Sequence, residues 1–157
     1  MNPKTSDYQK QQRYQENEIL EHAAEILATR YVRGDALTNP DATKEYVHFK
    51  LGSYEREVFT LLLLDNQNRL IEFRKLFHGT VDTASVYPCE VVKAVLEVNA
   101  ATVIFAHNHP SGDSTPSQAD RRITERLKDA LALVNVRVLD HIVTGDTCTS
   151  FAERGWL

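Results

Sequence analysis

Two histidines and one aspartate lie at a spacing that suits a metal ion. His107 and His109 flank a single asparagine, and Asp120 follows eleven positions after His109, in the stretch AHNHPSGDSTPSQAD. Alternate side chains of an extended chain point to the same side, with Cα atoms roughly 6.5 Å apart, so both imidazoles can reach one cation. Two histidines and a carboxylate leave a fourth tetrahedral position for water, as in catalytic rather than closed structural zinc sites.

Each part of this pattern also has a simpler interpretation. Ser117 and Asp120 form a variant of the capping box, and the helix dipole stabilises a carboxylate in the first turn without any metal. Two neighbouring histidines can equally belong to an ordinary polar loop. The combination favours a metal site, because His-x-His-Pro, a loop bounded by Pro110 and Pro116, and Ser-x-x-Asp follow one another directly after an apolar strand.

The segments that must hold these residues alternate between strand and helix. Branched and aromatic runs predict strands, and amphipathic runs predict helices. The expected strands cover 55–65, 70–79, 101–106 and 136–145, and the expected helices 88–100 and 117–135. Such interleaving predicts an α/β or α+β protein with a single mixed β-sheet packed by helices.

A helical region is expected ahead of the first strand. Residues 1–14 lack apolar periodicity and are expected to form a loose arm. Apolar residues then recur at helical spacing over Glu16–Arg33, which predicts an amphipathic helix that ends at Gly34. Asn39 is expected to cap a second short helix, which begins with Pro40 and ends near Lys50.

The overall composition is that of one ordinary globular domain. The chain has 157 residues, is 42% hydrophobic and 25% charged, and carries a net charge of −4. This balance gives no general reason to expect nucleic-acid binding, which usually requires a basic domain or stripe. Cys89 and Cys148 form neither a disulfide framework nor a zinc ribbon. Without an apolar signal segment or a run long enough to span a bilayer, we expect a cytoplasmic protein with no membrane contact.

The motif and its surroundings resemble a known family. The His107-x-His109-Pro110 and Ser117-x-x-Asp120 elements match the JAMM (JAB/MPN+) metalloprotease motif, H-x-H-P…S-x-x-D. The longer segments that resemble the RadC family are REVFTLLLLDNQNRLI, LFHGTVD, EVVKAVLEVNAATVIFAHNHPSGDSTPSQAD, LDHIVTGD and SFAERG. The resemblance covers about residues 40–155 and implies a JAMM/cytidine-deaminase-like architecture. We therefore expect a RadC-like JAMM (MPN) domain at 40–157, preceded by the N-terminal arm and helix at 1–39.

The resemblance also implies a set of site residues. The implied ligands of a zinc ion, with water as the fourth, are His107, His109 and Asp120. JAMM enzymes use a glutamate on an earlier strand as general base. Its position just before Val58 makes Glu57 our assignment, and Glu55, on the same side of an extended strand, is the alternative. Ser117 is expected to hydrogen-bond the developing oxyanion.

Two further polar residues and one departure stand out near the motif. His141, in LDHIVTG, either orients a metal ligand from behind or is an ordinary histidine within a strand. Asn108, between the two candidate ligands, is expected to present its amide to the opposite side. Cys89 stands where the family typically has an arginine, directly before Glu90. This departure does not fall on a residue of the motif.

The favoured function is therefore that of a zinc-dependent hydrolase of the JAMM type. We expect a metallopeptidase or isopeptidase that uses a metal-activated water on an unknown peptide or isopeptide substrate. Two alternatives stay open: a non-enzymatic accessory domain in DNA repair or mobile-element biology, and a metal-dependent nuclease. RadC proteins usually carry a helix-hairpin-helix domain ahead of this unit, which we do not find here, so direct DNA binding stays open. In a homodimer, the first helix is the segment that would pair.

Overall fold

One five-stranded sheet organises the chain. The computed structural model describes residues 3–33, 37–79 and 86–157. Its elements are α1 (Pro3–Arg33), α2 (Pro40–Leu51), β1 (Val58–Leu64), β2 (Leu70–His78), α3 (Pro88–Glu97), β3 (Thr102–Asn108), α4 (Gln118–Ala132), β4 (Arg137–Thr144) and β5 (Cys148–Ser150). The strand order is β2-β1-β3-β4-β5, in which β3 and β4 are parallel and the other pairs antiparallel. The predicted fold class, a single mixed sheet packed by helices, is confirmed.

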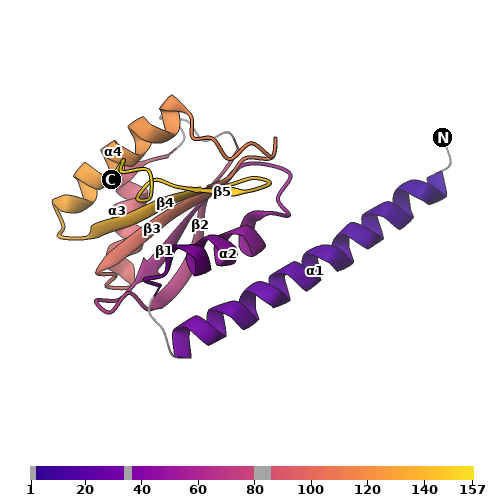
Figure 1. The fold of residues 1–157 in the computed structure, drawn as a ribbon, viewed down its shortest axis with the longest axis horizontal. Helices are drawn as coiled ribbons and strands as arrows, with labels where there is room; N and C mark the ends of the chain where they lie inside the picture. The colour runs from indigo at the N-terminus through magenta and orange to yellow at the C-terminus, as the bar shows by residue number, and fades with distance from the viewer. Residues whose placement is uncertain (1–2, 34–36, 80–85) are drawn as a thin grey trace.

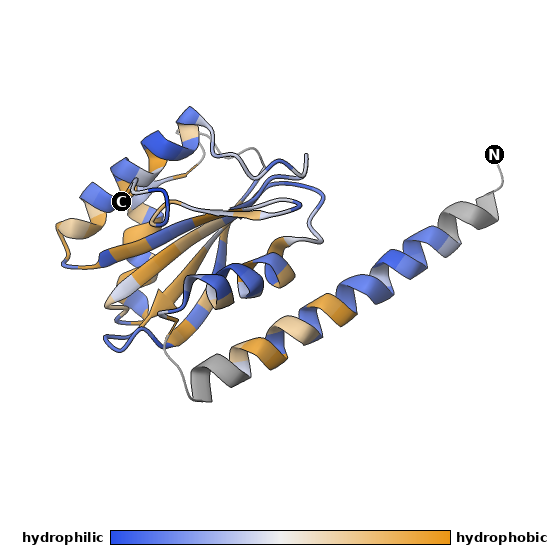
Figure 2. Cartoon of the chain, viewed as in Figure 1, coloured by the Kyte–Doolittle hydropathy of each residue, from blue (hydrophilic) through white to orange (hydrophobic). Residues whose placement is uncertain are grey.

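Helices cover both faces of this sheet. Helices α3 and α4 lie on one face, and α2 lies on the other, beside α1 (Figure 1). All seven residues of β1 and all seven of β3 are buried, as expected of central strands covered on both sides. Figure 2 shows these central strands as hydrophobic. The site at the end of β3 is therefore held by the best-packed part of the molecule.

Strand alternation sorts the residues of β3 between the two faces. Val103 and Phe105 pack with α3 and α4, whereas Ile104 and Ala106 pack with α2. Because successive side chains of a strand point to opposite sides, His107 continues the first series. Asn108 continues the second series, toward the face that α2 covers. The strand extends through both residues and does not end at 106, where the sequence placed its boundary.

The prediction of a loose arm is wrong for residues 3–14, because α1 is helical from Pro3. This stretch consists largely of good helix formers such as glutamine, lysine and arginine, and has neither glycine nor proline after Pro3. The stretch lacks apolar periodicity because this part of the helix is exposed: Tyr8 and Tyr14 are 71% and 66% exposed. No helix in the described ranges is both long and apolar enough to cross a membrane. The predicted helix end at Gly34 lies outside the described residues.

The sheet also has an edge strand that the sequence did not predict. We expected the segment 136–145 to close the sheet, but β5 follows it and pairs with the end of β4. Its three residues, Cys148–Ser150, contain no apolar run from which a strand could be recognised. The part of the segment LFHGTVD from residue 80 onward lies outside the described residues.

Candidate metal centre

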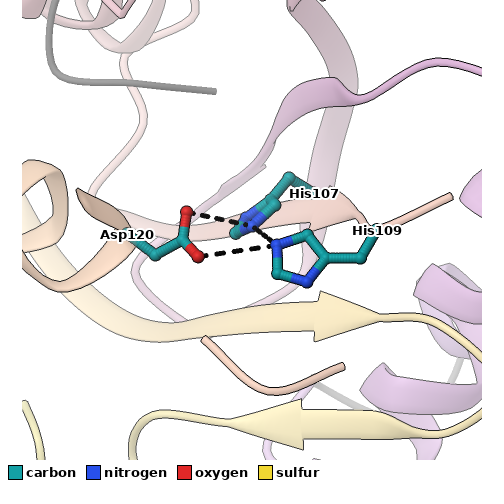
Figure 3. Close-up of side chains that lie close together, drawn as sticks. All are labelled: His107, His109 and Asp120. Atoms are coloured by element: carbon teal, nitrogen blue, oxygen red, sulfur yellow. Dashed lines mark hydrogen bonds and ion pairs between the residues drawn. The ribbon is translucent and has the colours of Figure 1, made fainter. Parts of the chain in front are cut away.

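The three predicted ligands meet at the end of β3. His107 lies in the strand, His109 directly follows it, and Asp120 lies in the first turn of α4 (Figure 3). The two histidine Nε2 atoms are 3.0 Å apart, and they lie 3.3 and 3.5 Å from the Asp120 carboxylate oxygens. Ligand atoms bound tetrahedrally at about 2.0–2.1 Å are about 3.3 Å from one another. These contacts, which involve both oxygens of the Asp120 carboxylate, are close to that spacing, and one ligand atom from each residue lies within 4.8 Å of the others, so the cluster could hold a metal ion.

The cluster is buried except at one ligand. The side chains of His107 and Asp120 are 0% and 2% exposed, whereas that of His109 is 14% exposed. Burial opposes the ionisation of Asp120, but the two histidines beside its carboxylate outweigh it and hold its pKa far below its usual range. The hydrogen bond to Asp120 also raises the pKa of His109. The metal-free cluster thus strongly favours an ionised carboxylate beside the imidazoles.

The tautomer of His109 follows from its second ring nitrogen. His109 Nδ1 lies 2.8 Å from the backbone carbonyl oxygen of Asp113. A carbonyl oxygen can only accept, so Nδ1 carries the proton, and a neutral His109 directs an unprotonated Nε2 into the cluster. Between that lone pair and the ionised, buried carboxylate, either a proton or a metal ion can bind. The donor set therefore fits a bound metal ion.

The simpler interpretation of Ser117 and Asp120 also holds in the structure. Ser117 Oγ accepts from the Asp120 backbone amide at 3.1 Å, and Asp120 Oδ2 accepts from the Ser117 amide at 2.7 Å, which completes a capping box. The cap fixes the orientation of the carboxylate that faces His107 and His109. Because Ser117 Oγ accepts in this bond, its hydroxyl proton is directed elsewhere.

The loop between His109 and α4 is held against the turn between β4 and β5. The His109 amide donates to the Thr144 carbonyl at 2.8 Å, and the Asp146 amide donates to the Gly112 carbonyl at 2.7 Å. A Cβ atom at Gly145 would lie only 2.2 Å from the Gly112 carbonyl oxygen, so the two backbones approach as closely as glycine allows. The loop is a fixed support for His109.

The structure places the two candidate glutamates, Glu55 and Glu57, in different surroundings. Glu55 has a side chain 76% exposed and forms an ion pair with Arg13 of α1 at 2.5 Å. Glu57 is half-buried at the start of β1, and its negative charge contributes to the raised pKa of His109. Phe59, two residues after Glu57, pairs with His107. Glu57 therefore lies beside the end of β3 that carries the candidate ligands.

The side-chain amide of Asn108 forms hydrogen bonds with the backbone of the segment that carries Glu57. Its Oδ1 accepts from the Val58 amide at 2.8 Å, and its Nδ2 donates to the carbonyls of Tyr54 and Arg56 at 3.2 and 3.0 Å. Asn108 is only 3% exposed, so these backbone groups would have few other partners. The amide faces away from the histidines, as strand alternation predicts, and it orders the chain on both sides of Glu57.

We expect Asn108→Ala to lower the free energy of unfolding by about 2–4 kcal/mol, because it leaves buried backbone groups without partners. Urea unfolding measures this change, and amide hydrogen exchange locates it. The Val58 amide should exchange faster in the variant. Asn66→Ala, in the exposed turn after β1, is the matched control and should change neither quantity. Unchanged protection of the Val58 amide would contradict the role given to Asn108.

Two buried residues lie directly behind the cluster. His141 Nε2 is 2.8 Å from His107 Nδ1, and burial lowers the pKa of His141 well below its ordinary value. Thr124 lies 2.6 Å from the other ring nitrogen of His141. The sequence analysis missed Thr124, whose one indication is its place a helical turn after Asp120 on the buried face of α4.

Comparison with known proteins assigns the chain to a family. A family model described as a RadC-like JAB domain matches residues 37–156. A UPF0758 protein of Vibrio cholerae serotype O1 is 92% identical over 157 residues, which cover both chains fully. A second UPF0758 protein of that organism is 66% identical over 93% of this chain and 92% of its own. A UPF0758 protein of Aeromonas hydrophila is 57% identical over 88% of this chain, which spans 62% of that relative. The chain belongs to the RadC-like JAB domain family.

Proposed function

We propose that the protein is a zinc-dependent hydrolase of the JAMM type that cleaves a peptide or isopeptide bond. The observation that carries the proposal is the cluster of His107, His109 and Asp120, with contacts of 3.0–3.5 Å between their ligand atoms and one ligand partly open to solvent. Membership of the RadC-like JAB domain family supports it. An open coordination position beside three protein ligands is typical of catalytic zinc.

The donor set favours zinc over the common hard cations. Mg²⁺ and Ca²⁺ prefer sites made entirely of oxygen, whereas two imidazole nitrogens and one carboxylate suit zinc. When bound, zinc supplies a water of lowered pKa and polarises the carbonyl of the scissile bond. The ligands His107, His109 and Asp120 would hold it, and the remaining chemistry belongs to side chains around them.

Glu57 and Ser117 are the side chains proposed for that chemistry. The Glu57 carboxylate would accept a proton from the attacking water and return it to the leaving amine. Ser117 Oγ already accepts the Asp120 amide, so its own proton can be donated to the oxyanion of the substrate. A donor of this kind contributes about 2.7–4 kcal/mol in other enzymes. Glu57 directly precedes β1, which pairs with β3, and Ser117 is the N-cap residue of α4.

A polar groove next to the exposed ligand supports a polypeptide substrate. The groove has a volume of about 580 Å³ and lies between α1 and the segment 52–55. Pro110, which directly follows His109, is one of its lining residues. Among its other lining residues are Arg13, Glu16, Asn17 and Glu55. These groups suit the hydrogen bonds of a peptide backbone better than a small apolar molecule.

Glu57→Gln is expected to keep bound zinc and to lose hydrolysis by about 10²–10⁴-fold, the usual contribution of a general base. The assay is cleavage of a library of fluorogenic peptides and isopeptides by zinc-loaded protein. Glu125→Gln removes an exposed carboxylate of α4 outside the groove and should leave cleavage unchanged. Full activity of Glu57→Gln would contradict its role. Zinc-loaded wild type that cleaves no library member would contradict the hydrolase and favour the accessory domain.

A further inference from the structure

A continuous row of hydrogen bonds connects the backbone of Asp120 with the ring of His107. Thr124 Oγ1 donates to the Asp120 carbonyl oxygen at 2.6 Å and lies 2.6 Å from His141 Nδ1. His141 Nε2 in turn lies 2.8 Å from His107 Nδ1. Thr124 is 1% exposed and both histidines are 0% exposed, so water does not replace these bonds.

The donors and acceptors of this row fit one assignment. The carbonyl of Asp120 only accepts, so it receives the Thr124 proton, and Thr124 Oγ1 accepts from His141 Nδ1. The two ring nitrogens of His141 face an imidazole and a hydroxyl, and neither partner carries a negative charge that would require a second ring proton. A neutral His141 has one ring proton, so its Nε2 accepts and His107 Nδ1 donates. His107 then has an unprotonated Nε2.

We propose that His141 and Thr124 are positioning residues that hold His107 in its Nδ1–H tautomer and direct its Nε2 lone pair at the metal. This inference rests on the proposed metal site. The Asp113 carbonyl imposes the same tautomer on His109, so both imidazoles present the same nitrogen. Partners behind a metal ligand commonly set ring orientation and affinity in this way.

The row also links the ligands to one another. Thr124 follows Asp120 by one turn of α4, so the turn that delivers the carboxylate also orients His107 through His141. His141 reaches this position because β4 runs parallel to β3, with His141 opposite Phe105 and next to the His107 end of the strand. A shift of α4 along its axis would therefore disturb the tautomer and the carboxylate together.

The test must distinguish the positioning role of His141 from a purely structural role in aromatic packing. Its ring stacks on Phe151 at 4.7 Å and meets Phe59 and Phe105 edge-on at 5.8 Å each. His141→Phe keeps an aromatic ring among these neighbours and removes both nitrogens. Thr124→Val keeps the side-chain shape and removes only the hydroxyl. Thr124→Ser keeps the hydroxyl and is the matched control.

The tautomer of His107 can be measured by long-range ¹H–¹⁵N NMR of metal-free protein. We expect Nδ1–H for His107 in the wild type and in Thr124→Ser, and a shift toward Nε2–H in Thr124→Val and His141→Phe. Zinc affinity, measured by competition with a chromophoric chelator, should fall about 10–100-fold in the same two variants. Packing alone would not move the tautomer, so this readout is specific to positioning.

A folded Thr124→Val protein with wild-type tautomer and zinc affinity would overturn the proposal. A Thr124→Ser protein as impaired as Thr124→Val would overturn it as well, since the hydroxyl would then be irrelevant. If Thr124→Val does not fold, a wild-type His107 that carries its proton on Nε2 still overturns the proposal. A wild type that shows the expected tautomers and binds zinc but cleaves no substrate refutes the proposed hydrolase while the positioning role stands, and a wild type that binds no zinc overturns both.

Discussion

Asp120→Asn protein is expected to bind zinc about 100-fold more weakly than wild type, or worse, and to remain folded. Loss of a mere partner behind a metal ligand already costs about 10–100-fold in affinity, and Asp120 is a proposed ligand itself. The asparagine side chain has nearly the same shape, and its carbonyl oxygen can still accept the Ser117 amide. The helix cap therefore survives, whereas the negative charge facing His107 and His109 does not.

The measurement is competition with a chromophoric zinc chelator, with thermal unfolding of each variant alongside. Asp129→Asn is the control, because Asp129 is an exposed carboxylate on the same helix, α4. Its zinc affinity should equal that of wild type. Equal affinities of Asp120→Asn and wild type would remove Asp120 from the metal site.

Zinc is also expected to stabilise the folded chain, and to do so more strongly at pH 8 than at pH 6. A ligand at 1,000 times its dissociation constant adds about 4 kcal/mol to the free energy of unfolding. For a chain of this size, that raises the melting temperature by about 8–16 °C. Thermal unfolding of metal-free and zinc-loaded protein at both pH values measures the effect.

The direction of this pH dependence follows from His109. The hydrogen bond to Asp120 raises the pKa of His109 in the metal-free fold. Protonated His109 thus contributes stability that is complete below its unfolded pKa of about 6.5 and disappears as pH rises through the raised value. Zinc requires the neutral imidazole, so its binding strengthens over the same interval. Asp120, with its lowered pKa, stays ionised throughout.

A melting-temperature gain from zinc that is equal at both pH values, or larger at pH 6, would contradict this account. His22→Ala provides a control for surface histidines, because His22 is an exposed residue of α1. It should show the same zinc-induced shift as the wild type at each pH. The double variant His107→Ala/His109→Ala should show no shift at either pH.

The sequence predicted the sheet well because its central strands are almost wholly apolar. The runs around β1 and β3 have no polar face, so they could only be buried between two helical layers. By contrast, β5 is three polar or small residues whose pairing depends on the end of β4. The N-terminal part of α1 was missed because an exposed polar helix has no periodicity to recognise.

The candidate ligands could be found from spacing because they lie close together in the chain. Their supporting residues could not, since each bond depends on strand register. Asn108 reaches the Val58 amide across 50 positions, and His141 reaches His107 across 34. Thr124 carries no motif, and its hydroxyl gains a role only when β4 places His141 beside α4. The ion pair of Glu55 with Arg13 likewise joins residues 42 positions apart in the chain.

The most direct test of the metal site is the zinc content of tag-free protein, measured by plasma mass spectrometry after purification and again after incubation with zinc and desalting. His107→Ala/His109→Ala is measured beside the wild type. We predict close to one zinc ion per wild-type chain and essentially none in the double variant. A wild type without zinc after incubation, or a double variant that retains the wild-type amount, would contradict the site at the end of β3.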